Sequence, residues 1–266
     1  MNKIRVLVSG AFGRMGREVV KAIVAQDDMT LVGAVDKTGV GAEIGQVCGL
    51  ETLGIKIEQD LLSALKRTEA EVMVDFTTPL AVMENIKAAA ETKVAGVIGT
   101  TGLTAENLEE INELASKSEK CFLVAPNFAI GAVLMMGFAH EAAKYFPDVE
   151  IIELHHDRKL DAPSGTAIKT AELIATGRVA EPVAKPAPLE KINGARGGEY
   201  LGIKIHSVRL PGLIAHQEII FGNQGQTLTI RHDSLDRSSF MPGVLMAIRK
   251  VPTLKGFYYG LESLVD

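Results

Sequence analysis

The chain has 266 residues, a formal net charge of −5 and two cysteines, and hydrophobic residues make up 47% of it. This composition is typical of a folded globular protein and excludes a disordered or collagen-like chain. The acidic balance argues against a nucleic-acid-binding protein, which usually carries a basic patch. Cys48 and Cys121 are too few for a disulfide framework or a zinc site, so we expect a reducing, cytoplasmic setting.

The first 126 residues alternate short apolar runs with amphipathic ones. Such repeated strand–helix–strand units, with strands that are apolar throughout, predict a parallel sheet with helices on both faces. The fold class expected for this half is therefore α/β, with a Rossmann-type sheet. We expect strands at 4–9, 31–35, 72–76, 94–98 and 121–125, and helices at 14–26, 80–92 and 104–118.

Residues 121–140 contain no Asp, Glu, Lys or Arg and are numerous enough to span a bilayer. Pro126-Asn127 interrupts the stretch, however, and two glycines dilute its apolar character. We therefore predict a buried strand over 121–125, a turn and a buried helix over about 130–145. No membrane association is expected.

The pattern changes after about residue 148 and predicts a second, α+β domain with an open mixed sheet. Tight turns at Pro211-Gly212 and at 222–225 separate its last three strands, so we expect these strands to pair antiparallel in succession. The tail from residue 239 is expected to be helical or irregular. The expected elements are a strand at 150–154, a helix at 166–176, a loop at 178–199 and strands at 203–210, 213–221 and 226–232.

A glycine-rich loop follows the first strand and opens a helix, with the spacing GxxGxxG from Gly10 to Gly16. Glycines let backbone N–H groups approach a phosphate, and the helix N-terminus attracts it, although a glycine turn without a ligand is the alternative. Asp36 lies 20 positions beyond Gly16 and can accept hydrogen bonds from an adenosine ribose. Lys37 can pair with a 2′-phosphate or be a solvated surface lysine, and together these residues predict that either NADH or NADPH is used.

Two further strand ends carry small polar residues, at 77–78 and at 99–102. Ligands of open α/β sheets bind beyond the carboxyl ends of the strands. We therefore expect these residues to line the nicotinamide side of the site, although threonines at such positions can also simply cap helices.

The densest group of chemically active side chains spans residues 153–166. His155, His156 and Lys159 supply hydrogen-bond donors and proton sources near neutral pH. Ser-Gly-Thr at 164–166 opens a helix, whose N-terminus attracts carboxylates, although the serine can also be a simple cap. The segment predicts a small-molecule dicarboxylate substrate. No metal is expected, because no known metal-ligand spacing is present.

These motifs occur in the same order in a known family. The chain resembles the 4-hydroxy-tetrahydrodipicolinate reductases, also called dihydrodipicolinate reductases, of lysine (diaminopimelate) biosynthesis. The resemblance covers essentially the whole chain, and the segment 153–166 is its most specific part. The resemblance rests on the glycine loop and on four further motifs: VDFT at 74–77, GTTG at 99–102, APNF at 125–128 and ELHHDRKLDAPSGT at 153–166.

The resemblance implies an oxidoreductase that reduces 4-hydroxy-tetrahydrodipicolinate to tetrahydrodipicolinate with NADPH or NADH. It implies that residues 1–127 and 238–266 form the dinucleotide-binding domain. The domain over 128–237 is expected to bind substrate and to build a homotetramer through its sheet.

The resemblance also implies roles for single residues. The expected catalytic residues are His155, as proton donor and acceptor, and Lys159, as proton donor. The expected substrate contacts are His156, Gly165 and Thr166, to which the helix start adds Ser164. The sequence departs from the family at Phe12, where many members have a small residue. The expected cofactor contacts are Gly10, Ala11, Phe12, Gly13, Arg14, Met15, Asp36, Lys37, Gly99, Thr100, Thr101, Ala125, Pro126, Asn127 and Phe128.

Two other functions remain open. A different nicotinamide-dependent reductase, such as a semialdehyde or hydroxyacid dehydrogenase, would need a catalytic Cys with a partner His, or a single Asp/His pair. Neither Cys48 nor Cys121 lies in such a sequence context. A non-enzymatic dinucleotide sensor would explain the first half of the chain but would leave the segment 153–166 without a use.

Overall fold

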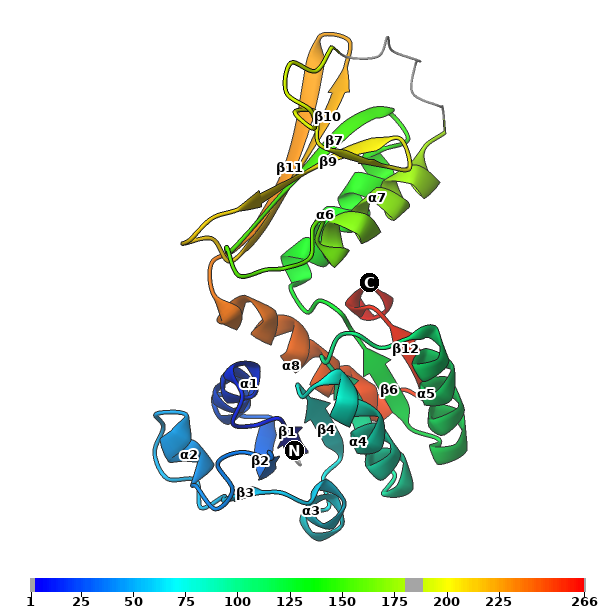
Figure 1. Cartoon of the computed structure of the whole chain (residues 1–266). Coiled ribbons are helices and arrows are strands. Elements are labelled where there is room, and N and C mark those ends of the chain that lie inside the picture. The colour runs from blue at the N-terminus through cyan, green and yellow to red at the C-terminus, as the bar shows by residue number, and fades with distance from the viewer. Residues whose placement is uncertain (1–2, 180–188, 266) are drawn as a thin grey trace. The chain divides into compact units, whose positions relative to one another are not determined.

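The computed structural model describes residues 3–179 and 189–265 (Figure 1). The chain divides into two compact units. Unit 1 contains residues 1–130 and 240–266, and unit 2 contains residues 131–239. In the order of the chain, unit 2 is therefore an insertion within unit 1.

Unit 1 contains a seven-stranded sheet in which every pairing is parallel, in the order β12-β6-β5-β4-β1-β2-β3. The chain leaves β1 toward β2 and β3 and then returns to the other side of β1 to form β4, so the strand order reverses there. The predicted Rossmann-type sheet is confirmed. Its strands are β1 (Ile4–Ser9), β2 (Met29–Val35), β3 (Ile57–Glu58), β4 (Val72–Asp75), β5 (Ala95–Ile98), β6 (Cys121–Val124) and β12 (Gly256–Tyr259).

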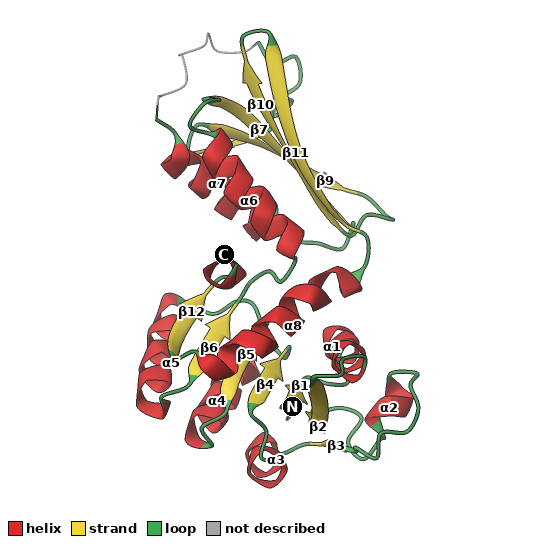
Figure 2. Ribbon diagram, turned by 180° about the vertical axis from the view of Figure 1, so that it is seen from behind, coloured by secondary structure: helices red, strands yellow, loops and turns green. Residues whose placement is uncertain are grey.

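Helices cover both faces of this sheet (Figures 1 and 2). Helices α3, α4 and α5 pack in succession on one face, and α1 packs with α8 on the other. Leu7, Met73 and Phe122 point from three strands into the core beneath α3, α4 and α5. Burial on both faces explains why the strands are apolar throughout. The helices are α1 (Arg14–Val24), α2 (Ile44–Val47), α3 (Leu61–Thr68), α4 (Pro79–Glu91), α5 (Ala105–Ser118) and α8 (Met241–Lys250).

The tail of the chain completes unit 1. Helix α8 agrees with the expected helical tail. The expectation was wrong for residues 256–259, which form β12, pair parallel with β6 and extend the sheet. Phe257, Tyr258 and Tyr259 favour a strand because aromatic residues fit a half-buried pleated surface. A strand of four residues is too short for its periodicity to stand out. The short elements α2, β3 and α3 also lie in a stretch for which the sequence predicted nothing.

Unit 2 contains a five-stranded sheet in the order β11-β10-β7-β9-β8. The β7–β9 pairing is parallel and the others are antiparallel, which confirms the predicted mixed sheet. Helices α6 (Ile130–Ala142) and α7 (Gly165–Gly177) lie side by side on one face of it (Figure 2). The strands are β7 (Asp148–His155), β8 (Gly198–Tyr200), β9 (Ile203–Arg209), β10 (Ala215–Asn223) and β11 (Gln226–Ser234).

The expected pairing of the last three strands was right for β10 with β11 and wrong for β9 with β10. Strand β7 lies between β9 and β10 and pairs with both. A turn does form at Pro211-Gly212, where the N–H of Leu213 donates to the Leu210 carbonyl at 3.4 Å. The five residues 210–214 are nevertheless enough to span the roughly 10 Å between strands two places apart. The end of the expected loop at 178–199 forms β8, and its residues 180–188 lie outside the described residues.

The charge-free stretch at 121–140 forms β6, a short connection and the start of α6, as predicted. Of the helices in the described part of the chain, none combines the length and the apolar character that a bilayer crossing requires.

The same substitution in two helices should have opposite effects on stability. A Cβ on Gly16 of α1 would lie 2.0 Å from the Gly10 carbonyl oxygen, so Gly16→Ala should lower the free energy of unfolding by about 1–3 kcal/mol. Gly137 is exposed on α6 with nothing within 4 Å of an added Cβ. Gly137→Ala should therefore raise the same quantity by about 0.5–1 kcal/mol. Chemical denaturation followed by circular dichroism measures both, and equal effects would contradict the packing described.

Candidate functional site

The glycine loop of unit 1 connects β1 to α1. Gly10 has a φ of +79°, which favours glycine, and a Cβ there would lie 2.4 Å from the Phe76 carbonyl oxygen. Helix α1 begins after Gly13, which has no side chain to cap it. The first N–H groups of the helix therefore stay available to a ligand, together with the partial positive charge of the helix end. This is the geometry of an anion site.

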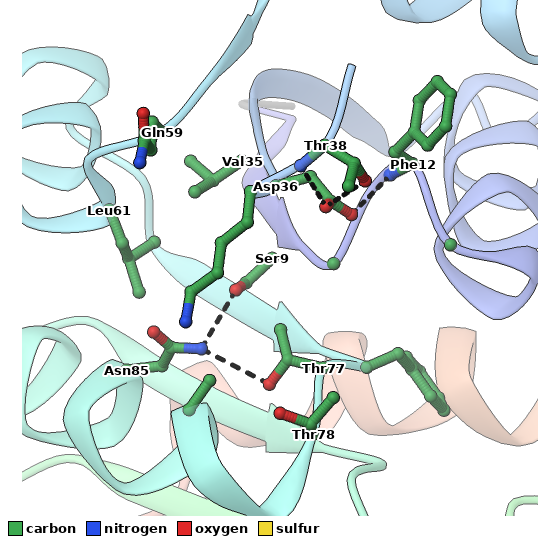
Figure 3. A pocket seen from close by; sticks show the side chains of 15 residues that line it. Ser9, Phe12, Val35, Asp36, Thr38, Gln59, Leu61, Thr77, Thr78 and Asn85 are labelled. Atoms are coloured by element: carbon green, nitrogen blue, oxygen red, sulfur yellow. Dashed lines mark hydrogen bonds between the residues drawn. The ribbon is translucent and has the colours of Figure 1, made fainter. Parts of the chain in front are cut away.

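A pocket of about 340 Å³ lies beside this loop, at the carboxyl ends of β1, β2 and β4 (Figure 3). This is where the strand order reverses, which is the position that open α/β sheets use for ligands. Five of the expected cofactor residues line the pocket. They are Gly10, Phe12, Gly13, Asp36 and Lys37.

Asp36 joins the glycine loop to the end of β2. Its carboxylate accepts hydrogen bonds from the N–H of Phe12 at 2.9 Å, and from the N–H and Oγ1 of Thr38 at 2.9 and 2.8 Å (Figure 3). A carboxylate offers about four acceptor positions, so capacity for about one further donor remains. Asp36 therefore shapes the loop as well as facing the pocket.

Phe12, the departure from the family pattern, has a definite packing role. A Cβ on Gly39 would lie 2.4 Å from the Phe12 ring, so Gly39 makes room for this ring. The Arg17 guanidinium lies 5.4 Å from the ring centroid on its face, at the distance of a cation–π contact. Phe12 thus ties the glycine loop to the loop that follows β2.

The residues expected on the nicotinamide side follow β4, β5 and β6. The Phe76 ring lies against Gly99, and a Cβ added to Gly99 would be 2.1 Å from that ring. The centroids of the Phe76 and Phe128 rings are 5.8 Å apart. The N–H of Thr77 donates to Thr100 Oγ1 at 2.8 Å. Contacts therefore connect the strand ends of β4, β5 and β6 with one another. Most of the other expected cofactor residues differ in exposure. The buried ones are Ala11, Thr100, Ala125 and Phe128, the half-buried ones are Met15 and Asn127, and the exposed ones are Arg14, Thr101 and Pro126.

In unit 2, a fully buried carboxylate organises the segment 153–166. Glu153 accepts two hydrogen bonds from Arg209, at 2.7 and 2.8 Å. It also contacts His155 Nδ1 at 2.5 Å and accepts from the N–H of Ser164 at 3.2 Å. Burial alone raises the pKa of Glu153, but hydrogen bonds from His155, Arg209 and Ser207 outweigh it and lower the pKa to about 2. The negative charge of Glu153 thus persists at neutral pH and holds the His155 ring.

Lys159 is held by the same network. Its ammonium contacts both carboxylate oxygens of Asp161, at 2.8 and 2.7 Å, and this hydrogen bond is the main cause that lowers the pKa of Asp161. Arg209 donates to the Asp161 carbonyl at 2.8 Å. The ion pair of Glu153 with Arg209 therefore links His155 to the loop that carries Lys159.

The other expected substrate contacts surround the start of α7. Ser164 is buried, and its hydroxyl accepts from the N–H of Ala167 at 3.2 Å, so it caps the helix. Gly165 is exposed and Thr166 is partly exposed at the first turn. His156 Nδ1 is buried without a hydrogen-bond partner among the described residues.

Four residues with central contacts have no role assigned from the sequence: Glu153 and Arg209 in unit 2, and Asp75 and Asn85 in unit 1, where Asn85 Nδ2 donates to Asp75 Oδ2 at 2.7 Å. Three of them carried a readable signal. Glu153 is in phase with buried Val149 and Ile151 along β7, and a charge on the buried face of a strand requires a partner. Arg209 shares the phase of Ile203 and Ile205, and Asp75 ends an otherwise apolar strand. Asn85 on α4 carried no such signal.

Both thiols are unsuited to nucleophilic catalysis. Cys48 and Cys121 are buried, and burial raises the pKa of the Cys121 thiol to about 12 and also raises the pKa of Cys48. Within residues 3–179 and 189–265, no three His, Cys, Asp or Glu side chains gather as metal ligands would.

Comparisons with known proteins agree with the motifs. The family model described as dihydrodipicolinate reductase, N-terminus, matches residues 4–128, and the model described as dihydrodipicolinate reductase, C-terminus, matches residues 131–265. The 4-hydroxy-tetrahydrodipicolinate reductase of Desulfitobacterium hafniense is 55% identical over the full length of both chains. The enzyme of that name from Moorella thermoacetica is 53% identical over 99% of this chain and 98% of its own.

A solved structure supports the same relationship. Dipicolinate-bound dihydrodipicolinate reductase from Paenisporosarcina sp. TG-14 is similar to this chain with a TM-score of 0.88 and 47% identity. The match covers 99% of this chain and 100% of the other. The resemblance seen in the sequence is confirmed, and the chain belongs to the dihydrodipicolinate reductase family.

Proposed function

We propose that this chain is an NAD(P)H-dependent reductase that converts 4-hydroxy-tetrahydrodipicolinate to tetrahydrodipicolinate in lysine (diaminopimelate) biosynthesis. One observation carries the proposal: unit 1 has an uncapped helix start beside a pocket, and unit 2 has a helix start tied to a histidine and a lysine. The first suits a dinucleotide, and the second suits a dicarboxylate that must be protonated. The names of the relatives support the same activity.

The residues of unit 1 fit a nicotinamide dinucleotide. The glycine loop and the start of α1 would hold the pyrophosphate, and the pocket beside Asp36 would hold the adenosine. Asp36 favours a free 2′-hydroxyl, whereas Lys37, exposed at the pocket, favours a 2′-phosphate. We propose that both NADH and NADPH are used. The strand-end residues near Gly99 and Phe128 would then lie on the nicotinamide side, and residues 1–127 with 238–266 would act as the cofactor domain.

The residues of unit 2 fit the other half of the reaction. The 4-hydroxyl would leave as water together with a ring hydrogen, which gives a C=C bond conjugated with the substrate C=N bond. When bound, the dinucleotide would supply a hydride to this conjugated system. The ring nitrogen must then gain a proton, and Lys159 or His155 can supply it. Glu153 accepts from His155 Nδ1, which leaves Nε2 to face the substrate. The substrate carboxylates would bind at the start of α7, beside Ser164 to Thr166, and at His156.

We further propose that the chain forms a homotetramer through the open face of the unit 2 sheet and acts in the cytoplasm. That face carries three half-buried apolar residues, Ile152, Leu154 and Ile220, which alternate along their strands with buried ones. Partly exposed apolar side chains of this kind suit a surface that contacts a partner. The particle mass from light scattering tests the assembly.

Oxidation of NADPH by freshly generated 4-hydroxy-tetrahydrodipicolinate tests the function directly. We expect turnover that depends on this substrate and loss of absorbance at the reduced nicotinamide band. A semialdehyde or hydroxyacid dehydrogenase would consume NADPH only with its own substrate. A sensor would bind the dinucleotide without oxidising it, and either outcome would overturn the proposal.

Removing a proton donor should slow the reaction without weakening the binding of the cofactor. Lys159→Ala and His155→Ala should each lower kcat by about 10²–10⁴-fold, the usual contribution of general acid–base catalysis. NADPH binding, measured by calorimetry, should survive because both residues lie in unit 2. Lys169→Ala, on the exposed surface of α7, is the matched control. Turnover like that of the unaltered chain in both variants would refute the assignment.

The low pKa of Glu153 predicts how stability depends on pH. A carboxyl whose pKa falls from 4.5 to about 2 on folding stabilises the fold by up to about 3 kcal/mol above pH 4.5. This stabilisation should disappear as the pH falls from about 4.5 to 2. Glu153→Gln should remove this slope and lower stability at neutral pH, in denaturation curves recorded across that range. The control Glu113→Gln, on the exposed surface of α5, should keep the slope of stability against pH.

A further inference from the structure

Asp75 is a charged residue that the chemistry above leaves without a task. Its side chain is fully buried at the carboxyl end of β4, the strand between β1 and β5. A buried carboxylate is costly unless donors surround it, and an apolar residue would hold a strand at least as well. The position therefore suggests a role beyond folding.

The contacts of Asp75 connect three strand ends and a helix. Its Oδ1 accepts from Thr100 Oγ1 at 2.7 Å, from Thr77 Oγ1 at 2.8 Å and from the N–H of Thr77 at 3.1 Å. Its Oδ2 accepts from Asn85 Nδ2 at 2.7 Å. Asn85 also donates to Ser9 Oγ at 3.2 Å and lies between Ser9 and Thr77 (Figure 3). The Thr77 N–H and the NH2 group of Asn85 can only donate, so both oxygens of Asp75 accept.

The pocket determines the direction in which a bound dinucleotide must run. Its adenosine end would lie beside Asp36 at the end of β2, and its pyrophosphate at the start of α1. The other half must then extend to the opposite side of β1, where β4 and β5 end. Thr77 and Thr100, the two residues that Asp75 holds, lie at those ends.

We propose that Asp75 is a positioning residue for the nicotinamide end of the cofactor. By holding Thr77 and Thr100, it sets the two strand-end loops against which the nicotinamide ring and its carboxamide rest. Asp75 acts through these threonines and does not itself contact the cofactor. The inference rests on the proposed function, because it presupposes a nicotinamide dinucleotide.

Asp75→Asn tests the proposal because it keeps the size of the side chain and turns one acceptor into a donor. Either Asn85 or the two threonines then lose an acceptor, so the strand-end loops that these residues belong to should shift, and NADH binding should weaken about tenfold. ADP-ribose lacks the nicotinamide ring, so its binding should weaken much less than that of NADH, even though Thr77 and Asn85 also line the pocket that would hold its adenosine. Calorimetry measures both ligands without any turnover.

A reciprocal exchange supplies the rescue. In the double variant Asp75→Asn with Asn85→Asp, the amide at position 75 can donate to the carboxylate at position 85, and its oxygen still accepts from Thr77 and Thr100. NADH binding should recover most of the loss. Asp27→Asn, in the exposed turn before β2, is the matched control and should alter neither ligand.

If Asp75→Asn does not fold, Thr100→Val tests the same contact, because it keeps the shape of the side chain and removes only the hydroxyl that Asp75 holds. The same selective loss of NADH binding is expected. Unaltered NADH binding, or equal losses for NADH and ADP-ribose, would overturn the inference, since equal losses indicate a merely structural role. Failure of the unaltered chain to bind either NADH or NADPH would instead overturn the proposed function, and this inference with it.

Discussion

A carboxylate buried at the end of a central strand must be surrounded by hydrogen-bond donors, and each unit of this chain contains one. Asp75 ends β4 in unit 1, and Glu153 lies near the end of β7 in unit 2. Because both are fully desolvated, their donors must come from neighbouring elements and must keep their places. Several of those donors, such as Thr77, Thr100 and Ser164, lie where a strand has ended or a helix begins. In each unit, the buried charge therefore fixes segments that we propose to contact a ligand.

The two helix starts differ in a way that matches the ligands proposed for them. Helix α1 begins after a glycine without a cap, so its N–H groups are left for a ligand. Helix α7 begins with a serine whose hydroxyl already accepts from Ala167, and the charged pair Glu153 and Arg209 lies beside the substrate site proposed there. A pyrophosphate can be held by backbone alone, whereas a substrate that must receive a proton needs titratable groups beside it.

Periodicity and motif spacing were sufficient to predict the class of each sheet and to place Asp36 beside the glycine loop. The chemistry of the segment 153–166 stays a prediction. Periodicity and spacing failed where a decision depended on distant partners. Strand β7 lies between β9 and β10 because it can pair on both edges, and no local turn signal reports that. Arg209 completes the Glu153 network from 56 residues away. Asn85 looks in the sequence like any polar residue of a helix, and its hydrogen bond to Asp75 is seen only once the position of β4 is known.

The position of β12 has a consequence for synthesis of the protein. Strand β6 is made before unit 2, but its outer edge is covered only by residues 256–259, near the end of the chain. While the ribosome makes unit 2, the nascent chain therefore carries an open parallel sheet with an apolar strand at its border. Unpaired edges of this kind invite aggregation. Residues 256–259 close that border only after unit 2 has been made, so chains cut before residue 256 should depend on chaperones.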